Sequence, residues 1–374
     1  MGITTGLARS TRLMLAGRLQ EATAEIQRSL GAASPMGSGP MSSGPMAGRF
    51  TPGSMSGAFT PGSFGAGRFG AGFPSGTFPG GSGFGGAGFG GTTTAGTGST
   101  APGSVTRGSA NGLAYRLYVP TRPQSPAPLL VALHGGTQDA DTFATSTGLD
   151  EVAEREGVVV VYPEQSRSAN AMGYWNWFRP GDQVRDAGEP GQIAAVVREV
   201  SAAHEVDRDR VGVVGFSAGA AMAAVLAAVY PDVFCGAGVH SGLPYRAATD
   251  VGSAFAAMKS PPATVADAGP VPLCVIHGDA DPTVAPANAD AVVRSGLLAR
   301  TGAREERTTG QVEGGRSWTR RRWSEDGGRV VVESWTVHGM THDWSGGRAG
   351  ASYADPTGPD ASSLLVEFLG MRRS

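Results

Sequence analysis

Several features are scarce in this chain of 374 residues, and each absence narrows the possibilities. Cysteine occurs only twice, at Cys235 and Cys274, and both lie in or beside apolar runs far apart in sequence, so we expect buried free thiols and no disulfide. The single lysine, Lys259, stands in a loop-like MKSPPA segment, which argues against Schiff-base chemistry. No run reaches the roughly 18 apolar residues of a membrane span. We therefore expect a soluble protein without a transmembrane segment.

An excess of either charge is also missing. The formal net charge is -2 at pH 7, which gives no sign of a polyanionic partner such as nucleic acid. The arginine run at 320–322 is short and lies between Trp318 and Trp323, a pattern typical of the solvated face of a β-hairpin. No residues have the spacing of metal ligands, and GFSAGA lacks both the lysine of a phosphate loop and the spacing of a dinucleotide fingerprint. We predict neither a metal nor a cofactor.

Residues 1–31 are predicted to form an N-terminal amphipathic helix that ends at Gly31. Apolar residues recur there at helical spacing, and charged residues occupy the other side of the helical wheel. A docking or oligomerising helix is favoured over one that adsorbs to a surface. The apolar core of a secretory signal needs at least about seven residues, and the LMLAG run is shorter. We therefore predict a cytoplasmic protein, with secretion as the alternative.

Residues 32–108 are rich in glycine, proline and serine. The segment repeats FTPGS at residues 50 and 59 and then spaces phenylalanines among glycines. Such a composition cannot bury enough apolar area to offset its ordering entropy, so we predict a flexible, disordered linker. The regularly spaced phenylalanines suggest a further possibility, which is weak adhesion to a hydrophobic surface.

From residue 109 to residue 374 the pattern is that of an α/β domain. Short, nearly continuous apolar runs alternate with helical segments, which predicts a mainly parallel sheet with helices on both faces. The apolar runs include LLVALHG, GVVVVYP, VGVVGFS and PLCVIHG. The expected helices lie near residues 142–156, 189–206, 217–230, 285–300 and 360–370.

The segment GFSAG, from Gly215 to Gly219, carries the first candidate for chemistry. It matches G-x-S-x-G, with a strand-like run before it and a helix-like run after it, which is the context of a nucleophile elbow. The flanking glycines are needed because strand and helix pass closely at so sharp a turn. Ser217 is therefore predicted to be a catalytic nucleophile.

A serine nucleophile needs a base and a carboxylate, which should follow it in the order acid and then histidine. Asp279 and Asp281 follow one later strand, and His338 and His342 follow the last strand. Asp281 is favoured because it lies further into its loop, and His342 because it follows a Gly-Met-Thr turn and can point back toward Ser217. Asp279 and His338 remain as alternatives.

Two backbone N–H groups are needed to stabilise the oxyanion of an acyl-transfer reaction. Ala218, the residue after the nucleophile, is predicted to supply one. Gly136, in the segment LHGGTQDADTF, is predicted to supply the other. The alternative is a glycine turn without a catalytic role.

Together these segments resemble the polyhydroxyalkanoate (poly(3-hydroxybutyrate)) depolymerase family of α/β-hydrolase esterases, which is close to the feruloyl and acetylxylan esterases. The resemblance covers about residues 112–370 and the N-terminal helix. It lies in the segments LHGGTQDADTFA, YWNWF, GFSAGAAMA, GVHSGLPY, IHGDADPTV and GMTHDWSGG.

The resemblance implies an α/β-hydrolase fold and hydrolysis of short-chain 3-hydroxyalkanoate esters through an acyl-enzyme, without a cofactor. It implies Ser217, Asp281 and His342 as the catalytic residues. It also implies that Trp175, Asn176 and Trp177 line the substrate cleft, for which core packing or gating is the alternative. The HGG segment precedes the serine motif, as in the type 1 arrangement of the family.

The chain departs from the family pattern at one pair of positions. Family members often carry cysteine where this chain has Gly136 and Tyr174, so a bridge between those loops is absent here. Two other functions stay open: a feruloyl or acetylxylan-type carbohydrate esterase, and a non-catalytic protein that coats polymer granules. The partners expected are an ester substrate and a hydrophobic polymer surface.

Overall fold

The computed structural model of this protein describes residues 100–373. The helix predicted over 1–31 and residues 32–99 of the predicted linker lie outside the described residues. Strand β1, Ser104–Ala110, begins inside the predicted linker, so the sheet starts earlier than the boundary predicted at residue 109. The sequence SVTRGSA gives little strand signal because this edge strand is mostly exposed and has few apolar side chains to bury.

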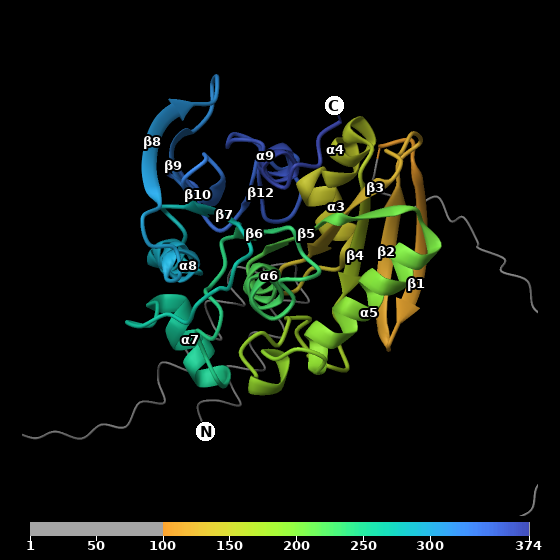
Figure 1. The fold of residues 1–374 in the computed structure, drawn as a ribbon, viewed down its shortest axis with the longest axis horizontal. Helices are drawn as coiled ribbons and strands as arrows, with labels where there is room; N and C mark the ends of the chain where they lie inside the picture. The colour runs from red at the N-terminus through yellow and green to blue at the C-terminus, as the bar shows by residue number, and fades with distance from the viewer. Residues whose placement is uncertain (1–99, 374) are drawn as a thin grey trace, which may run out of the picture. The chain divides into compact units, whose positions relative to one another are not determined.

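Ten strands form one sheet in the order β1-β2-β4-β3-β5-β6-β7-β10-β9-β8 (Figure 1). The five pairings from β4 through β3, β5, β6 and β7 to β10 are parallel, and the pairings at both edges are antiparallel. The mainly parallel sheet is confirmed. The remaining strands are β2 Leu113–Val119, β3 Ala127–Leu133, β4 Val159–Glu164, β5 Val206–Phe216, β6 Gly236–His240, β7 Leu273–Gly278, β8 Arg304–Gln311, β9 Ser317–Ser324 and β10 Val330–Val337, with β11 Trp344–Ser345 and β12 Ala354–Asp355 in a separate pair.

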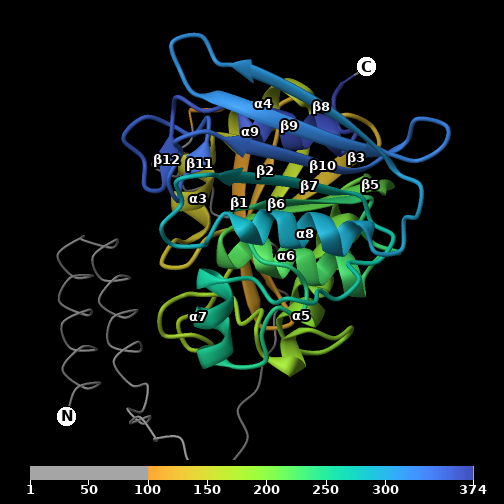
Figure 2. The same cartoon turned by 90° about the vertical axis from the view of Figure 1, so that its left-hand side faces the viewer.

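Helices cover both faces of the sheet, as predicted (Figures 1 and 2). One buried cluster contains side chains of α5, α6, α7 and α8, and the other contains side chains of α3, α4 and α9. Helix α7 was not predicted; it is short and begins with a capping box between Asp250 and Ser253. The helices are α3 Ala140–Thr147, α4 Leu149–Glu156, α5 Gly188–Ala203, α6 Ala218–Val229, α7 Val251–Lys259, α8 Ala287–Leu297 and α9 Ala361–Phe368, with a 3-10 turn η1 at Pro180–Asp182.

The central strand β3 is apolar throughout because both of its faces are buried. In β3, Leu129, Val131 and Leu133 belong to one cluster, whereas Leu130 and Ala132 belong to the other. Alternate side chains of a strand point to opposite faces, so a strand between two helical layers needs an apolar residue at every position. This packing fixes the carboxyl ends of the parallel strands, where the candidate site lies.

The arginine run at 320–322 lies on β9, which pairs antiparallel with β8, so the predicted hairpin is confirmed. The prediction that these arginines lie on a solvated face is wrong in part. Arg320 and Arg322 both contact Glu333 on β10, and Arg321 contacts Asp290 on α8. The run therefore ties the hairpin to the rest of the domain.

The two cysteines are free thiols, as predicted. Cys274 is fully buried on β7, and Cys235 is half-buried just before β6. Burial raises the pKa of both thiols, that of Cys235 to about 11. Within residues 100–373, no helix is long and apolar enough to cross a membrane.

Candidate active site

Ser217 lies at the sharp turn between β5 and α6. Its backbone has φ 54° and ψ -116°, a conformation that L-residues with a side chain rarely adopt. The turn closes so tightly that a Cβ on Gly215 would lie 2.3 Å from the backbone of Gly219, and one on Gly219 would lie 2.2 Å from the Leu133 carbonyl oxygen. Both flanking positions therefore require glycine, and the turn holds the Ser217 side chain above the end of the sheet.

His342 links Ser217 to Asp281 through hydrogen bonds. Its Nε2 atom lies 2.9 Å from Ser217 Oγ, and its Nδ1 atom lies 2.6 Å from Asp281 Oδ2. The carboxylate can only accept, so Nδ1 carries the ring proton and Nε2 is left to accept the serine hydroxyl proton. The structure thus brings together the three side chains that the sequence favoured, from loops after β5, β7 and β10.

The surroundings of Asp281 keep it ionised. Its Oδ1 atom accepts hydrogen bonds from the backbone N–H groups of Thr283 at 2.8 Å and Val284 at 2.9 Å. Burial raises the pKa of Asp281, but hydrogen bonds from His277 and His342 outweigh it and hold this pKa well below its usual range. A fixed negative charge therefore lies behind the His342 ring.

Asp279 and His338, the alternatives left open by the sequence, form a separate pair. His338 Nδ1 lies 2.7 Å from Asp279 Oδ2, and its Nε2 lies 2.9 Å from the Thr319 hydroxyl on β9. Asp279 also accepts the backbone N–H of Gly339 at 2.6 Å. These contacts hold the last loop against the hairpin. His338 is thus bound to Asp279 and Thr319, whereas His342 is the histidine that contacts Ser217.

Gly136 and Ala218, the predicted oxyanion donors, lie in segments that pack against each other. A Cβ on the neighbouring Gly135 would lie 2.8 Å from the ring of Phe216, next to the serine. Within the described part of the chain, neither the Gly136 nor the Ala218 backbone N–H donates a hydrogen bond. Both donors are therefore available to a substrate oxygen.

Gly136 and Tyr174 are in direct contact, although neither is cysteine. A Cβ on Gly136 would lie 2.0 Å from Tyr174 Cε1. The tyrosine ring therefore fills the space beside Gly136 and joins the same two loops by packing instead of by a bridge. The next residue, Thr137, has φ 68°, so this loop holds a strained backbone close to the candidate site.

The predicted cleft residues are packed in the core. Trp175 is fully buried and donates its indole N–H to the His134 carbonyl oxygen at 3.1 Å. Asn176 is buried, and its backbone and side-chain N–H groups both donate to Glu189. Trp177 is 5% exposed and belongs to the same core. This burial favours the packing alternative, and the lining of a cleft by these residues stays a prediction, because a run of aromatic letters does not show which way its side chains face.

Two residues near the site were not assigned to it from the sequence. Tyr353 places its ring 6.4 Å from that of His342 and 6.0 Å from that of Phe216, centroid to centroid. His277 lies beside Asp281, with its Nε2 atom 3.2 Å from Asp281 Oδ2. Position at the end of a strand gives a signal for His277, whereas nothing local marks Tyr353.

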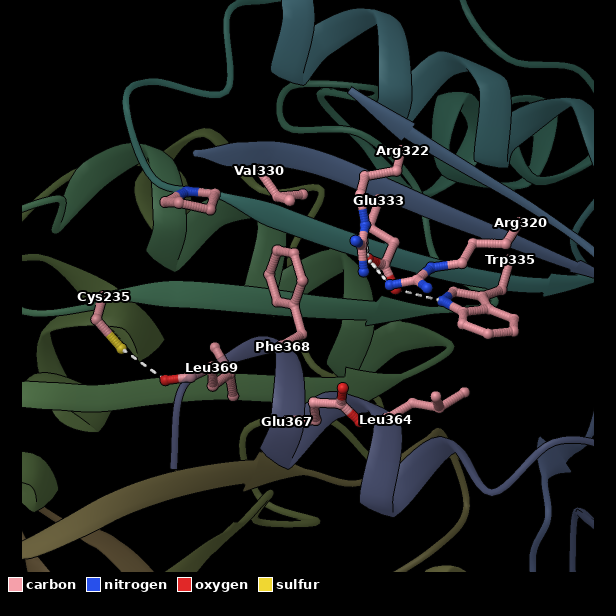
Figure 3. Close-up of a pocket in the computed structure, with 11 residues that line it drawn as sticks. Cys235, Arg320, Arg322, Val330, Glu333, Trp335, Leu364, Glu367, Phe368 and Leu369 are labelled. Carbon is pink, nitrogen blue, oxygen red and sulfur yellow. Dashed lines mark hydrogen bonds and ion pairs between the residues drawn. The ribbon is translucent and has the colours of Figure 1, made fainter. Parts of the chain in front are cut away.

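A separate pocket of about 420 Å³ lies between β10 and α9 (Figure 3). Arg320 and Arg322 enter it from β9, and both contact Glu333, which also accepts the indole N–H of Trp335. None of Ser217, Asp281 and His342 lines this pocket. The pocket is therefore distinct from the candidate active site. Among residues 100–373, no group of three or more His, Cys, Asp and Glu side chains is arranged to hold a metal ion.

In a comparison with protein families, residues 113–314 match the family described as "Esterase PHB depolymerase". Among curated relatives, poly(3-hydroxyalkanoate) depolymerase C of Paucimonas lemoignei is 37% identical over 239 residues, which is 60% of this chain and 57% of that protein. The putative esterase NocK of Nocardia uniformis is 33% identical over 262 residues, which is 63% of this chain and 71% of that protein. The chain thus spans little more than half the length of the first of these relatives.

A solved structure supports the fold. The acetyl xylan esterase from Aspergillus awamori superposes with a TM-score of 0.57 at 19% identity, over 72% of this chain and all of that one. The shared α/β sheet is thereby established, and the fold predicted from the sequence is confirmed.

Proposed function

Because this chain belongs to the PHB depolymerase family of esterases, we propose that it is a serine esterase that hydrolyses short-chain 3-hydroxyalkanoate ester bonds. The observation that carries this proposal is the chain of hydrogen bonds from Ser217 through His342 to Asp281. An alcohol is a poor nucleophile unless a base removes its proton and a carboxylate orients that base. In this chain one continuous set of contacts supplies both.

The acylation step follows from the proton positions. Ser217 Oγ attacks the ester carbonyl carbon while His342 Nε2 takes the hydroxyl proton. The carbonyl oxygen becomes negative, and the backbone N–H groups of Ala218 and Gly136 stabilise it. The bond to the leaving alcohol then breaks as the imidazolium returns the proton to the leaving oxygen, and the acyl group stays on Ser217.

Deacylation repeats these steps with water. His342 takes a proton from a water molecule, which attacks the acyl carbon, and the bond to Ser217 Oγ breaks as the imidazolium protonates the serine oxygen. The products are a carboxylic acid and the regenerated serine. Asp281 remains ionised throughout and stabilises the imidazolium in both steps.

The choice of 3-hydroxyalkanoate substrates is supported by the relatives. The family description names PHB depolymerase, and two similar proteins are named poly(3-hydroxyalkanoate) depolymerase C and poly(3-hydroxybutyrate) depolymerase. Carbohydrate esters are the competing class, because the feruloyl esterase B of Neurospora crassa is 33% identical over 150 residues. The phenylalanines of residues 32–108 would add affinity for a solid hydrophobic polymer.

The test compares wild-type protein with Ser217→Ala on p-nitrophenyl butyrate. We expect turnover by the wild type and none above background by the variant; equal rates would end the esterase proposal. Oligomers of 3-hydroxybutyrate are then compared with acetylated xylan and methyl ferulate. Faster turnover of either carbohydrate ester would replace the substrate class while leaving the mechanism. Binding to polymer granules without any hydrolysis would instead favour a coat protein.

A further inference from the structure

His277 makes a second contact with the Asp281 carboxylate. It is the penultimate residue of β7 and is 2% exposed. Its Nε2 atom lies 3.2 Å from Asp281 Oδ2 and 3.0 Å from the Val284 carbonyl oxygen. Both neighbours are acceptors, so Nε2 must carry the ring proton. The imidazole is therefore a donor to the same carboxylate oxygen that holds His342.

The other ring nitrogen of His277 has no such partner. Its Nδ1 atom is buried and makes no hydrogen bond to any residue among 100–373. A proton on Nδ1 would be a buried donor without an acceptor, which is costly. The ring is thus held as the neutral tautomer protonated at Nε2. Every polar interaction of this side chain is directed at the loop that carries Asp281.

The charge of Asp281 is consequently shared among four donors. Thr283 and Val284 bind Oδ1 through their backbone N–H groups, and His342 and His277 both bind Oδ2. Hydrogen bonds to an ionised group are stronger than neutral ones, and each draws on the same negative charge. The hold of Asp281 on the His342 ring therefore depends on whether His277 is present.

We propose that His277 is a positioning residue that fixes the Asp281 carboxylate and, by sharing its charge, sets the pH range over which His342 can act as a base. The inference rests on the proposed function and adds a residue to the catalytic machinery. Without the His277 N–H, Asp281 would attract the imidazolium form of His342 more strongly. Protonated His342 cannot accept the serine proton. As the pH is lowered, activity would therefore begin to fall at a higher pH than in the wild type.

The other groups near His342 are neutral, apart from one neighbour in the chain. His240 on β6 accepts the Ser345 backbone N–H at its Nε2 atom, and burial lowers its pKa well below the usual value. Burial likewise raises the pKa of Tyr353. Asp343 follows His342 directly and accepts a hydrogen bond from the exposed Thr341 hydroxyl. Asp281 is the carboxylate that contacts the His342 ring. Among the described residues, His277 is the one other side chain that donates a hydrogen bond to this carboxylate.

The choice of amide variants separates the two ring nitrogens. The amide nitrogen of glutamine lies near the position of Nε2, and that of asparagine lies near the position of Nδ1. His277→Gln keeps a donor toward Asp281, whereas His277→Asn and His277→Leu do not. If the His277 side chain only filled space, the Gln and Asn variants would have the same pH dependence of activity.

The measurement is kcat/KM for p-nitrophenyl butyrate as a function of pH. In His277→Asn and His277→Leu we expect the acid limb to move to higher pH and kcat/KM at neutral pH to fall by about tenfold, the effect of one hydrogen bond to a charged group. His277→Gln should restore the wild-type limb. His338→Gln is the matched control, because that histidine binds Asp279, and its acid limb should stay in place.

An unchanged acid limb in Asn and Leu variants that remain folded, or equal behaviour of Gln and Asn, would overturn the proposal. It can also fail without any variant, since nitrogen-15 NMR of the wild type must show His277 protonated at Nε2 and not at Nδ1. If wild-type protein hydrolyses the ester and Ser217→Ala does not, any such failure concerns His277 alone. If the wild type is inactive, the proposed function fails first.

Discussion

His342 Nδ1 lies 2.6 Å from Asp281 Oδ2, although the two residues are 61 positions apart in the chain. Each stands on a loop after a strand of the same sheet, β10 and β7, and these strands are parallel neighbours. Neighbouring parallel strands end at the same edge, so their loops meet there. The contact therefore depends on the pairing of β7 with β10, and the pairing depends on the apolar packing of the domain.

Asp281→Asn tests the acid of this pair. The amide leaves the shape almost unchanged but cannot hold the His342 proton at Nδ1, so we expect kcat for p-nitrophenyl butyrate to fall by about 10³- to 10⁴-fold, as in other serine hydrolases. Asp279→Asn is the matched control, because Asp279 binds His338 and the Gly339 N–H. The control should keep kcat within about threefold of wild type. A larger loss in Asp279→Asn than in Asp281→Asn would reverse the assignment.

How far the sequence predicts this site depends on how local each signal is. Ser217 is recognisable because glycines, strand and helix all lie within a few residues of it. The order of acid and histidine narrows the partners to two pairs, and only loop reach favours Asp281 and His342. Trp175 and Asn176 are buried and hydrogen-bonded to His134 and Glu189, which lie elsewhere in the chain, so their own sequence does not show this packing.

The edges of the sheet were hard to predict for a related reason. Strand β8, with the sequence REERTTGQ, is exposed along nearly its whole length. Among residues 100–373 it pairs with β9 alone, so few of its side chains need to be apolar. A central strand can be recognised from its own apolar residues, whereas an edge strand is specified by the neighbouring strand with which it pairs.

Gly136→Ala tests the oxyanion loop. The added Cβ would lie 2.0 Å from Tyr174 Cε1, so the loop must shift and move the N–H of residue 136. Loss of one oxyanion donor costs about 10²- to 10³-fold in kcat, and we expect an effect of that size with KM little changed. The control is Gly181→Ala, because a Cβ there meets nothing within 4 Å.

A second variant tests whether contact with the Tyr174 ring causes the loss of activity in Gly136→Ala. Combined with Tyr174→Ala, which removes the obstructing ring, Gly136→Ala should cost much less activity than it does alone. The comparison is a double-mutant cycle on kcat. Additive losses would show that Gly136 matters for a reason other than contact with this ring.

Glu189 should make the stability of the domain depend on pH. Burial raises its pKa from 4.5 to about 7, against N–H donors from Asn176 and Gln165 that lower it. A carboxyl whose pKa is raised on folding stabilises the folded state below the unfolded value and loses that contribution as pH rises through the folded value. We expect the free energy of unfolding to fall between about pH 4.5 and about pH 7, by up to about 3 kcal/mol.

Urea unfolding of wild type and Glu189→Gln across that range measures the effect. The amide cannot ionise, so the variant should lose most of this pH dependence, while Glu313→Gln, at an exposed position, should keep it. A slope in Glu189→Gln as steep as that of the wild type would place the titrating group elsewhere.

The start of the folded domain can be located by truncation. Strand β1 pairs with β2 from Ser104 to Ala110, and Tyr118 receives a hydrogen bond from the Gly103 N–H at 3.1 Å. Removing residues 1–99 leaves these contacts whole, so small-ester turnover and the free energy of unfolding should stay close to those of the full chain. Removing residues 1–108 deletes most of β1 and exposes the edge of β2. We expect it to lower the melting temperature measurably and to promote aggregation. Equal stability of the two truncations would show that β1 contributes nothing to the domain.

Hydrolysis of solid polymer by the protein that lacks residues 1–99 is a separate test of those residues. An unchanged rate would remove their proposed role in adhesion.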